Sequence, residues 1–138
     1  MTSIVSYDFH TVTRCQPCYT MNMFIAVDTG GTKTLITSFD VAGNAVAERK
    51  FPTPHDTTEY ISVLRSELEA MAGGHHVSGI VLALPGIIKN GVAVWCNNLG
   101  WRNFDVATAL RGVVGGAPLY IENDANLAGL AEARQLAD

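Results

Sequence analysis

The sequence predicts an α/β fold built on one mixed β-sheet, and three patterns along the chain indicate it. Three short β-type segments follow one another at residues 23–27, 34–39 and 45–51, separated by glycine-containing turns. A helical apolar period occupies residues 56–72, and a nearly continuous apolar run fills residues 77–84. An antiparallel meander that continues into parallel strands through crossover helices is a mixed α/β sheet.

The first two segments predict a hairpin. The apolar run at residues 23–27 ends at Asp28, and Gly30 and Gly31 then turn the chain into residues 34–39, which alternate as a strand does. The third segment is more polar and completes the meander. Two prolines end it, because proline cannot donate to a strand ladder.

The helix at residues 56–72 has a start and a stop signal. Asp56 and Glu59 have the spacing of a capping box, and Gly73 follows the last apolar position. The apolar side chains recur every three or four residues, which predicts one buried face; they are Ile61, Leu64, Leu68 and Met71.

The second half of the chain is predicted to contain further strands and helices. Residues 77–84 lack polar alternation, which predicts a strand covered on both faces. We further expect a strand at 92–96, a short helix at 105–113, a strand at 119–122 and a helix at 124–137. Ligands of such sheets collect beyond the carboxyl ends of the strands, so residues there are expected to converge on one cleft.

Composition narrows the class of protein. The 138 residues carry 9 Lys and Arg against 13 Asp and Glu, a net charge of −4 without any basic cluster, which argues against nucleic-acid binding. The apolar runs are far shorter than the roughly 20 residues of a membrane span. Three cysteines, Cys15, Cys18 and Cys96, do not form a secreted disulfide framework, so we expect a cytoplasmic protein.

Residues 1–22 read differently from the rest. They show no period and no pattern of a signal peptide, and we interpret them as an extension, either a disordered tail or a stretch upstream of the true start. The domain proper is expected at residues 23–138. Cys15 and Cys18 form a CxxC pair, but no second pair or nearby histidine pair completes a zinc site.

Three short motifs at predicted strand ends contain candidate binding and catalytic residues. Residues 28–33 (Asp-Thr-Gly-Gly-Thr-Lys) offer backbone N–H groups and side-chain donors to a phosphate, although a plain tight turn is the alternative. Residues 97–101 (Asn-Asn-Leu-Gly-Trp) offer an amide to sugar hydroxyls and a tryptophan wall, or only a turn with a buried Trp101. Residues 122–126 (Glu-Asn-Asp-Ala-Asn) offer a carboxylate, or only a helix cap. Together they suit phosphoryl transfer to an alcohol.

The same residues resemble the ROK family (repressors, open reading frames and kinases), whose enzymes are ATP-dependent sugar kinases. Residues 25–34 resemble its phosphate loop, 84–87 its Pro-Gly turn, 98–101 its Asn-Leu-x-Gly-Trp segment and 122–126 its catalytic Glu-Asn-Asp motif. The motifs match in order and spacing, with 26 positions from Asn98 to Asp124.

The resemblance implies one lobe of an actin-like (ribonuclease H-like) ATPase fold and phosphorylation of a hexose or related sugar, as in glucokinases. It implies that Asp124 is the general base and that Asp28 orients Mg²⁺. The sugar would be held near Gly86, Asn98 and Asn123. The phosphates of ATP would be held by Gly30, Gly31, Thr32 and Lys33.

In relatives, the segment after the catalytic motif carries a structural zinc site and the adenine-binding lobe. Because the sequence stops at Asp138, we expect an N-terminal lobe, with zinc only in a longer parent, which would commonly be a dimer. The alternatives are a non-catalytic sugar-sensing ROK regulator, for which residues 1–22 are too short and too neutral to form a DNA-binding domain, and an inactive lobe. Residues 98–101 disfavour the N-acetylglucosamine kinase branch with a similar loop. The sequence leaves the sugar open.

Overall fold

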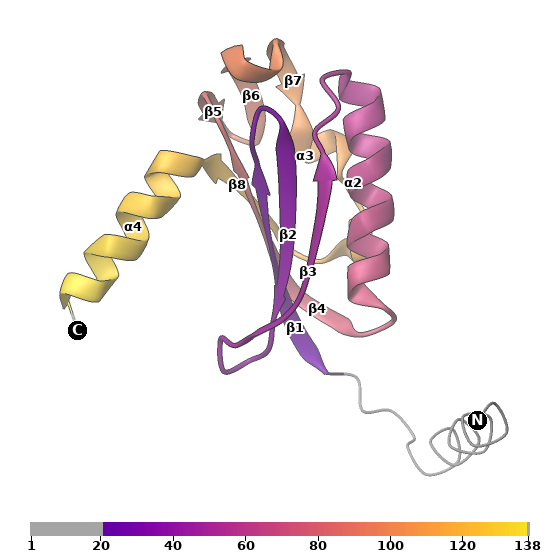
Figure 1. Cartoon of the computed structure of the whole chain (residues 1–138), viewed down its shortest axis with the longest axis vertical. Helices are drawn as coiled ribbons and strands as arrows, with labels where there is room; N and C mark the ends of the chain where they lie inside the picture. Colours follow the sequence, from indigo (N-terminus) through magenta and orange to yellow (C-terminus); the bar gives the residue numbers. More distant parts are fainter. Residues whose placement is uncertain (1–20, 138) are drawn as a thin grey trace, which may run out of the picture.

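The computed structural model of this chain describes residues 21–137, so the interpretation of residues 1–20, including Cys15 and Cys18, lies outside the described part. Eight strands and five helical segments make up this part, beginning with three consecutive strands (Figure 1). The elements are β1 (Asn22–Thr29), β2 (Lys33–Phe39), β3 (Ala45–Pro52), α2 (Thr57–Ala72), β4 (His76–Leu84), β5 (Ile87–Lys89), β6 (Val92–Cys96), η1 (Asn97–Leu99), β7 (Trp101–Asp105), α3 (Val106–Ala109), η2 (Val113–Gly116), β8 (Leu119–Asn123) and α4 (Asp124–Ala137).

The main sheet has the order β3-β2-β1-β4-β8 and confirms the predicted mixed topology. The three first strands form an antiparallel meander, and β4 and β8 run parallel to β1. The carboxyl ends of β1, β4 and β8 therefore lie at one edge, where the sequence motifs sit. Strand β1 begins at Asn22, one residue before the predicted start.

Helix α2 forms where the capping signal predicts it. The Asp56 carboxylate accepts a hydrogen bond from the Glu59 N–H at 2.9 Å, and Gly73 ends the helix with φ 55°. Its apolar face packs into the core with the inward side chains of the sheet, among them Ile25, Ile80 and Leu82. The fully buried positions include Tyr60 as well as Leu64 and Leu68.

The prediction that β4 is covered on both faces is wrong for this chain. Phe24, Val81 and Tyr120 point to the other face of the sheet and are 45%, 36% and 65% exposed. Helix α4 follows β8 but projects away from the sheet (Figure 1), and none of its residues is buried. An apolar run indicates that a strand is buried, but it does not say which element covers each of its faces.

A second, three-stranded sheet of order β5-β6-β7 was not fully predicted. Its first hairpin turns at Asn90 and Gly91, which have φ 51° and 77°, and this is the asparagine–glycine pair that favours a two-residue turn. Two tryptophans lie on the sheet: Trp101 is 2% exposed, whereas Trp95 is 46% exposed beneath the Arg102 guanidinium.

The expected helix at residues 105–113 is shorter than predicted. Helix α3 spans only Val106–Ala109, with the Asp105 carboxylate accepting the Thr108 N–H at 3.0 Å. Gly112 then takes a left-handed conformation, with φ 75°, which interrupts the helical path before η2. Among residues 21–137, no helix has the length and apolar character needed to cross a membrane.

Candidate functional site

The turn between β1 and β2 presents unpaired backbone donors. The Gly30 N–H donates to the Lys33 carbonyl at 2.9 Å, and a Cβ at Gly30 would lie 3.0 Å from that oxygen, so the tight approach favours glycine. Within the described residues, the N–H groups of Gly31 and Thr32 have no hydrogen-bond partner. Lys33 is exposed at the start of β2. Such a turn can bind an anion, as predicted for a phosphate loop.

The carbonyl oxygens of this turn are held from behind by residues 53–55. The Thr53 N–H donates to the Thr32 carbonyl at 2.9 Å, and the His55 ring nitrogen Nε2 lies 2.7 Å from the Gly31 carbonyl. His55 belongs to none of the sequence motifs, because an isolated histidine in a loop forms no recognisable pattern. These contacts turn the carbonyls of the loop toward residues 53–55.

Asp28 lies near the end of β1, one strand position before this turn, with an exposed side chain. Magnesium is commonly bound through one or two carboxylates together with water and substrate phosphates. Asp28 therefore fits the expected Mg²⁺ site as a single carboxylate beside the phosphate turn. Residues 21–137 contain no cluster of three or more His, Cys, Asp or Glu side chains that could hold a metal ion. A metal beside Asp28 would therefore need water and phosphate oxygens as its other ligands.

Asn98 lies beside the phosphate turn. A Cβ placed on Gly31 would lie 3.5 Å from the Asn98 Cβ, which brings two motifs that are far apart in the sequence into contact. Asn98 is exposed in η1, while the next residue, Leu99, is 2% exposed and anchors the segment in the core. Gly100 ends η1 with φ 71°.

Trp101 does not form an open wall of a sugar pocket. Its ring is buried between Tyr60, at a centroid distance of 4.7 Å, and Phe104, at 5.3 Å. Its Nε1–H donates to the His55 carbonyl at 2.8 Å. The Tyr60 hydroxyl in turn lies 2.7 Å from the Thr29 hydroxyl, and burial raises the pKa of Tyr60 well above its usual value. Trp101 therefore supports the site from within the core.

The Pro-Gly turn at the end of β4 packs closely on β6. Gly86 has φ 96°, and a Cβ there would lie 2.2 Å from the Trp95 carbonyl oxygen and 2.9 Å from the Cys96 Cα. Only glycine fits this approach. The Gly86 carbonyl accepts a hydrogen bond from the Asn123 side-chain amide at 2.5 Å, which joins the ends of β4 and β8.

Asn123 also caps α4. Its Oδ1 accepts the N–H groups of Ala125 and Asn126 at 2.9 and 3.2 Å, as the capping alternative predicts. The Glu122 carboxylate accepts the Asn123 N–H at 2.8 Å and the Asn126 side-chain amide at 3.1 Å, and these bonds lower the pKa of Glu122. Both the oxygen and the nitrogen of the Asn123 side-chain amide therefore already form hydrogen bonds within the protein.

Asp124 is the exposed carboxylate of the cluster. One oxygen, Oδ1, accepts the Ala125 N–H at 2.8 Å. The preceding residue, Asn123, bonds the Gly86 carbonyl, and Gly86 packs on Cys96, so Asp124 lies near the end of β6. Burial raises the pKa of the Cys96 thiol, and the negative charge of Asp124 raises it further. Cys96 is two residues from Asn98, a chain distance of at most about 7.6 Å between Cα atoms. The carboxylate, the amide and the phosphate turn therefore lie in one small region.

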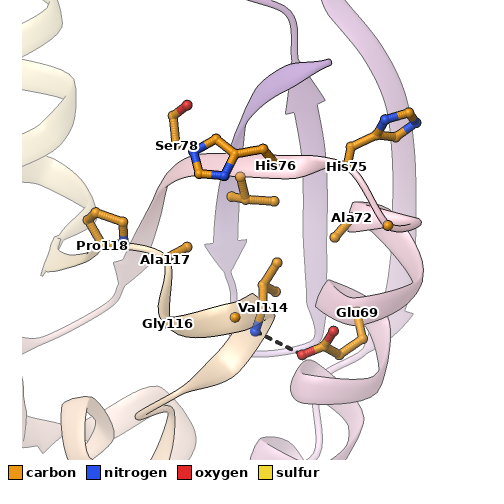
Figure 2. A pocket seen from close by; sticks show the side chains of 12 residues that line it. Glu69, Ala72, His75, His76, Ser78, Val114, Gly116, Ala117 and Pro118 are labelled. Atoms are coloured by element: carbon orange, nitrogen blue, oxygen red, sulfur yellow. Dashed lines mark hydrogen bonds between the residues drawn. The ribbon is translucent and has the colours of Figure 1, made fainter. Parts of the chain in front are cut away.

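A separate cavity of about 580 Å³ lies at the other end of β4, where the strand begins (Figure 2). Figure 2 shows the Glu69 carboxylate, which accepts the Val114 N–H at 2.8 Å beside this cavity. None of the predicted site residues lines it. A nine-residue strand spans about 30 Å, so this cavity is distant from the phosphate turn.

Comparisons with known proteins identify the family of this chain. The model of the ROK family matches residues 24–138. The glucokinase of Streptomyces coelicolor is 29% identical over 114 residues, and the match covers 81% of this chain and 36% of that enzyme. The chain thus spans about a third of the length of this relative.

Solved structures of ROK family proteins are similar to this chain. A ROK family glucokinase from Streptomyces griseus, in complex with glucose and AMPPNP, matches with a TM-score of 0.72 and 26% identity, covering 81% of this chain and 36% of that one. A ROK family transcriptional regulator, a homologue of the Escherichia coli MLC protein, matches with a TM-score of 0.72 at 18% identity over 90% of this chain and 35% of that one, which shows a shared fold alone. The expected actin-like ATPase fold is confirmed.

Proposed function

Because this chain belongs to the ROK family, whose model matches residues 24–138, we propose that it is the catalytic lobe of an ATP-dependent sugar kinase. The observation that carries the proposal is the convergence of three groups that follow the carboxyl ends of β1, β6 and β8. They are the unpaired N–H groups of Gly31 and Thr32, the exposed amide of Asn98 and the exposed carboxylate of Asp124. The glucokinases that match this chain support a hexose as the acceptor, with ATP as the donor.

In the proposed reaction, a sugar hydroxyl attacks the γ-phosphorus of ATP as its proton moves to the Asp124 carboxylate. The bond to the bridging oxygen breaks, ADP leaves, and the sugar phosphate forms. The Gly31 and Thr32 N–H groups, with Lys33, offset charge on the phosphate oxygens. Positioning and charge stabilisation supply most of such a rate enhancement.

The sugar is held, in this proposal, at the ends of β4, β6 and β8. The exposed Asn98 amide both donates to and accepts from neighbouring hydroxyls. The second hydrogen of the Asn123 amide and the backbone at Gly86 complete the set, because one Asn123 hydrogen already bonds the Gly86 carbonyl. Mg²⁺ bound beside Asp28 would supply charge neutralisation at the phosphates.

The general-base role is tested with Asp124→Asn, which keeps the shape of the side chain but accepts a proton poorly. ADP release is measured with MgATP and a panel of hexoses. We expect kcat to fall about 10²- to 10⁴-fold, while ATP binding, measured by calorimetry, stays unchanged. The control is Glu132→Gln, which removes one exposed charge from the same helix.

Near-normal turnover in Asp124→Asn would remove Asp124 from its role. If the unmodified chain binds a hexose but releases no ADP, phosphoryl transfer by this chain is wrong. In that case the non-catalytic alternatives, a sugar-sensing regulator or an inactive lobe, describe it better.

A further inference from the structure

His55 lies in a segment whose backbone is fixed to the core. The next residue, Asp56, caps α2, and the Trp101 Nε1–H donates to the His55 carbonyl at 2.8 Å. Trp101 is itself buried against Tyr60, which is fully buried and bonded to Thr29. The His55 backbone is therefore anchored to the end of β1 and the start of β7, although its side chain is exposed.

From this anchor the ring reaches the phosphate turn. Its Nε2 lies 2.7 Å from the Gly31 carbonyl oxygen. Because a carbonyl oxygen only accepts hydrogen bonds, Nε2 carries the proton and donates it. This is a contact between residues 24 positions apart, made by a side chain to a backbone group that the sheet ladder does not use.

The contact fixes the direction of a donor on the other side of the same peptide. The Gly31 carbonyl and the Thr32 N–H belong to one planar trans peptide unit, so they point in opposite directions. When the ring of His55 holds the carbonyl, the Thr32 N–H points away from residues 53–55. Gly31 has no Cβ to restrict rotation of this unit, and the ring supplies the restriction.

We propose that His55 is a positioning residue of the phosphate turn: it holds the Gly31 carbonyl and so preorients the Thr32 N–H for a polyphosphate. The identity of the anion, a polyphosphate, rests on the proposed function, whereas the contact between His55 and the Gly31 carbonyl does not. The Thr53 N–H acts on the next carbonyl in the same way, through its 2.9 Å bond to Thr32. His55 contributes the side-chain part of this support and is the part that a substitution can remove.

The test compares three variants of the whole chain. His55→Leu removes the donor, and His55→Gln places an amide N–H where the ring nitrogen was. His75→Leu is the matched control, because His75 is also an exposed loop histidine but lies beside the distant cavity. Binding of inorganic tripolyphosphate with Mg²⁺ is measured by calorimetry, and thermal unfolding by circular dichroism shows that each variant is folded.

We expect His55→Leu to weaken tripolyphosphate binding about five- to tenfold, the value of one hydrogen bond. His55→Gln should restore binding to within about twofold, since the donor is restored, and His75→Leu should match the parent. Equal binding by the parent and His55→Leu, or equal losses in the Leu and Gln variants, would overturn the proposal.

A second measurement needs no ligand and separates this proposal from the proposed function. Backbone ¹⁵N relaxation should give rigid order parameters, about 0.85, for Gly31 and Thr32 in the parent and in His55→Gln. In His55→Leu these values should fall below about 0.6. If no variant binds tripolyphosphate, the phosphate site is wrong, while the relaxation data still decide whether His55 orders the turn.

Discussion

Replacing Gly86 with alanine tests the packing that joins the ends of β4 and β6. Gly86 has φ 96°, and the new Cβ would lie 2.2 Å from the Trp95 carbonyl oxygen and 2.9 Å from the Cys96 Cα. An L side chain in such a conformation costs about 1–3 kcal/mol. The forced movement of backbone around an overpacked atom costs about 1–3 kcal/mol more.

Gly43→Ala provides the matched control. Gly43 has φ 88°, almost the same conformation, but a Cβ there would meet nothing within 4 Å. It should therefore show the conformational cost alone. The difference between the two variants isolates the contact with β6, and we expect it to be about 2 kcal/mol.

The assay is urea-induced unfolding followed by far-UV circular dichroism, with free energies extrapolated to water. Similar m-values in all three proteins would show that the same surface is exposed on unfolding. Equal destabilisation by Gly86→Ala and Gly43→Ala would refute the close approach of the Pro-Gly turn to Cys96. The convergence of the strand ends would then lose one of its contacts.

Three further predictions concern the core, the helix cap and the site. Leu64→Ala, at a fully buried position of α2, should lower the unfolding free energy by about 2–5 kcal/mol in the same urea assay. Asp56→Ala should cost about 1 kcal/mol in that assay, because the Glu59 N–H loses its partner. Asp124→Asn should lower the raised pKa of the buried Cys96 thiol, which a pH titration of the Cys96 Cβ chemical shift by NMR would show.

Each of these has a matched comparison. Ile61→Ala, at a half-buried position of α2, should cost less than Leu64→Ala, and a larger loss would contradict the packing. Asp56→Ser should keep most of the cap, so a Ser variant as unstable as Ala would argue against it. Glu132→Gln should leave the titration of Cys96 unchanged; the same shift in both charge variants would mean that Asp124 has no specific effect on the thiol.

The raised pKa of Cys96 also sets a pH dependence of stability. The folded thiol stays protonated at a pH where the thiol of the unfolded chain ionises, so the unfolded state binds fewer protons. Stability should therefore fall as the pH rises above about 8.5, the ordinary thiol pKa. Cys96→Ala should flatten this dependence in urea unfolding measured between pH 7 and 10, and an unchanged slope would contradict it.

Local patterns predicted most of the main sheet and its helix. The start of α2 at Asp56 and its end at Gly73 depend on hydrogen bonds between residues close in the sequence, so the residue types alone predict them. The β5–β6 hairpin also had a local signal in Asn90 and Gly91, but the short apolar runs beside it gave too weak a strand pattern to be recognised.

Long-range contacts could not be predicted in the same way. Motif order placed Asp28, Gly86 and Asp124 at strand ends, so their convergence could be expected from the topology of a parallel sheet. The contact of His55 with Gly31 depends on how the loop before α2 packs on Trp101, and no residue pattern encodes it. The uncovered face of β4 likewise depends on the path that α4 takes in space.

The two tryptophans of the small sheet give the chain a built-in pair of fluorescent reporters with opposite surroundings. Trp101, sealed against Tyr60, should emit at short wavelength and change only when the core opens. Trp95, which is 46% exposed and whose carbonyl abuts Gly86, should emit near the wavelength of indole in water. A molecule that covers the Trp95 ring would quench or blue-shift the second signal and leave the first unaltered.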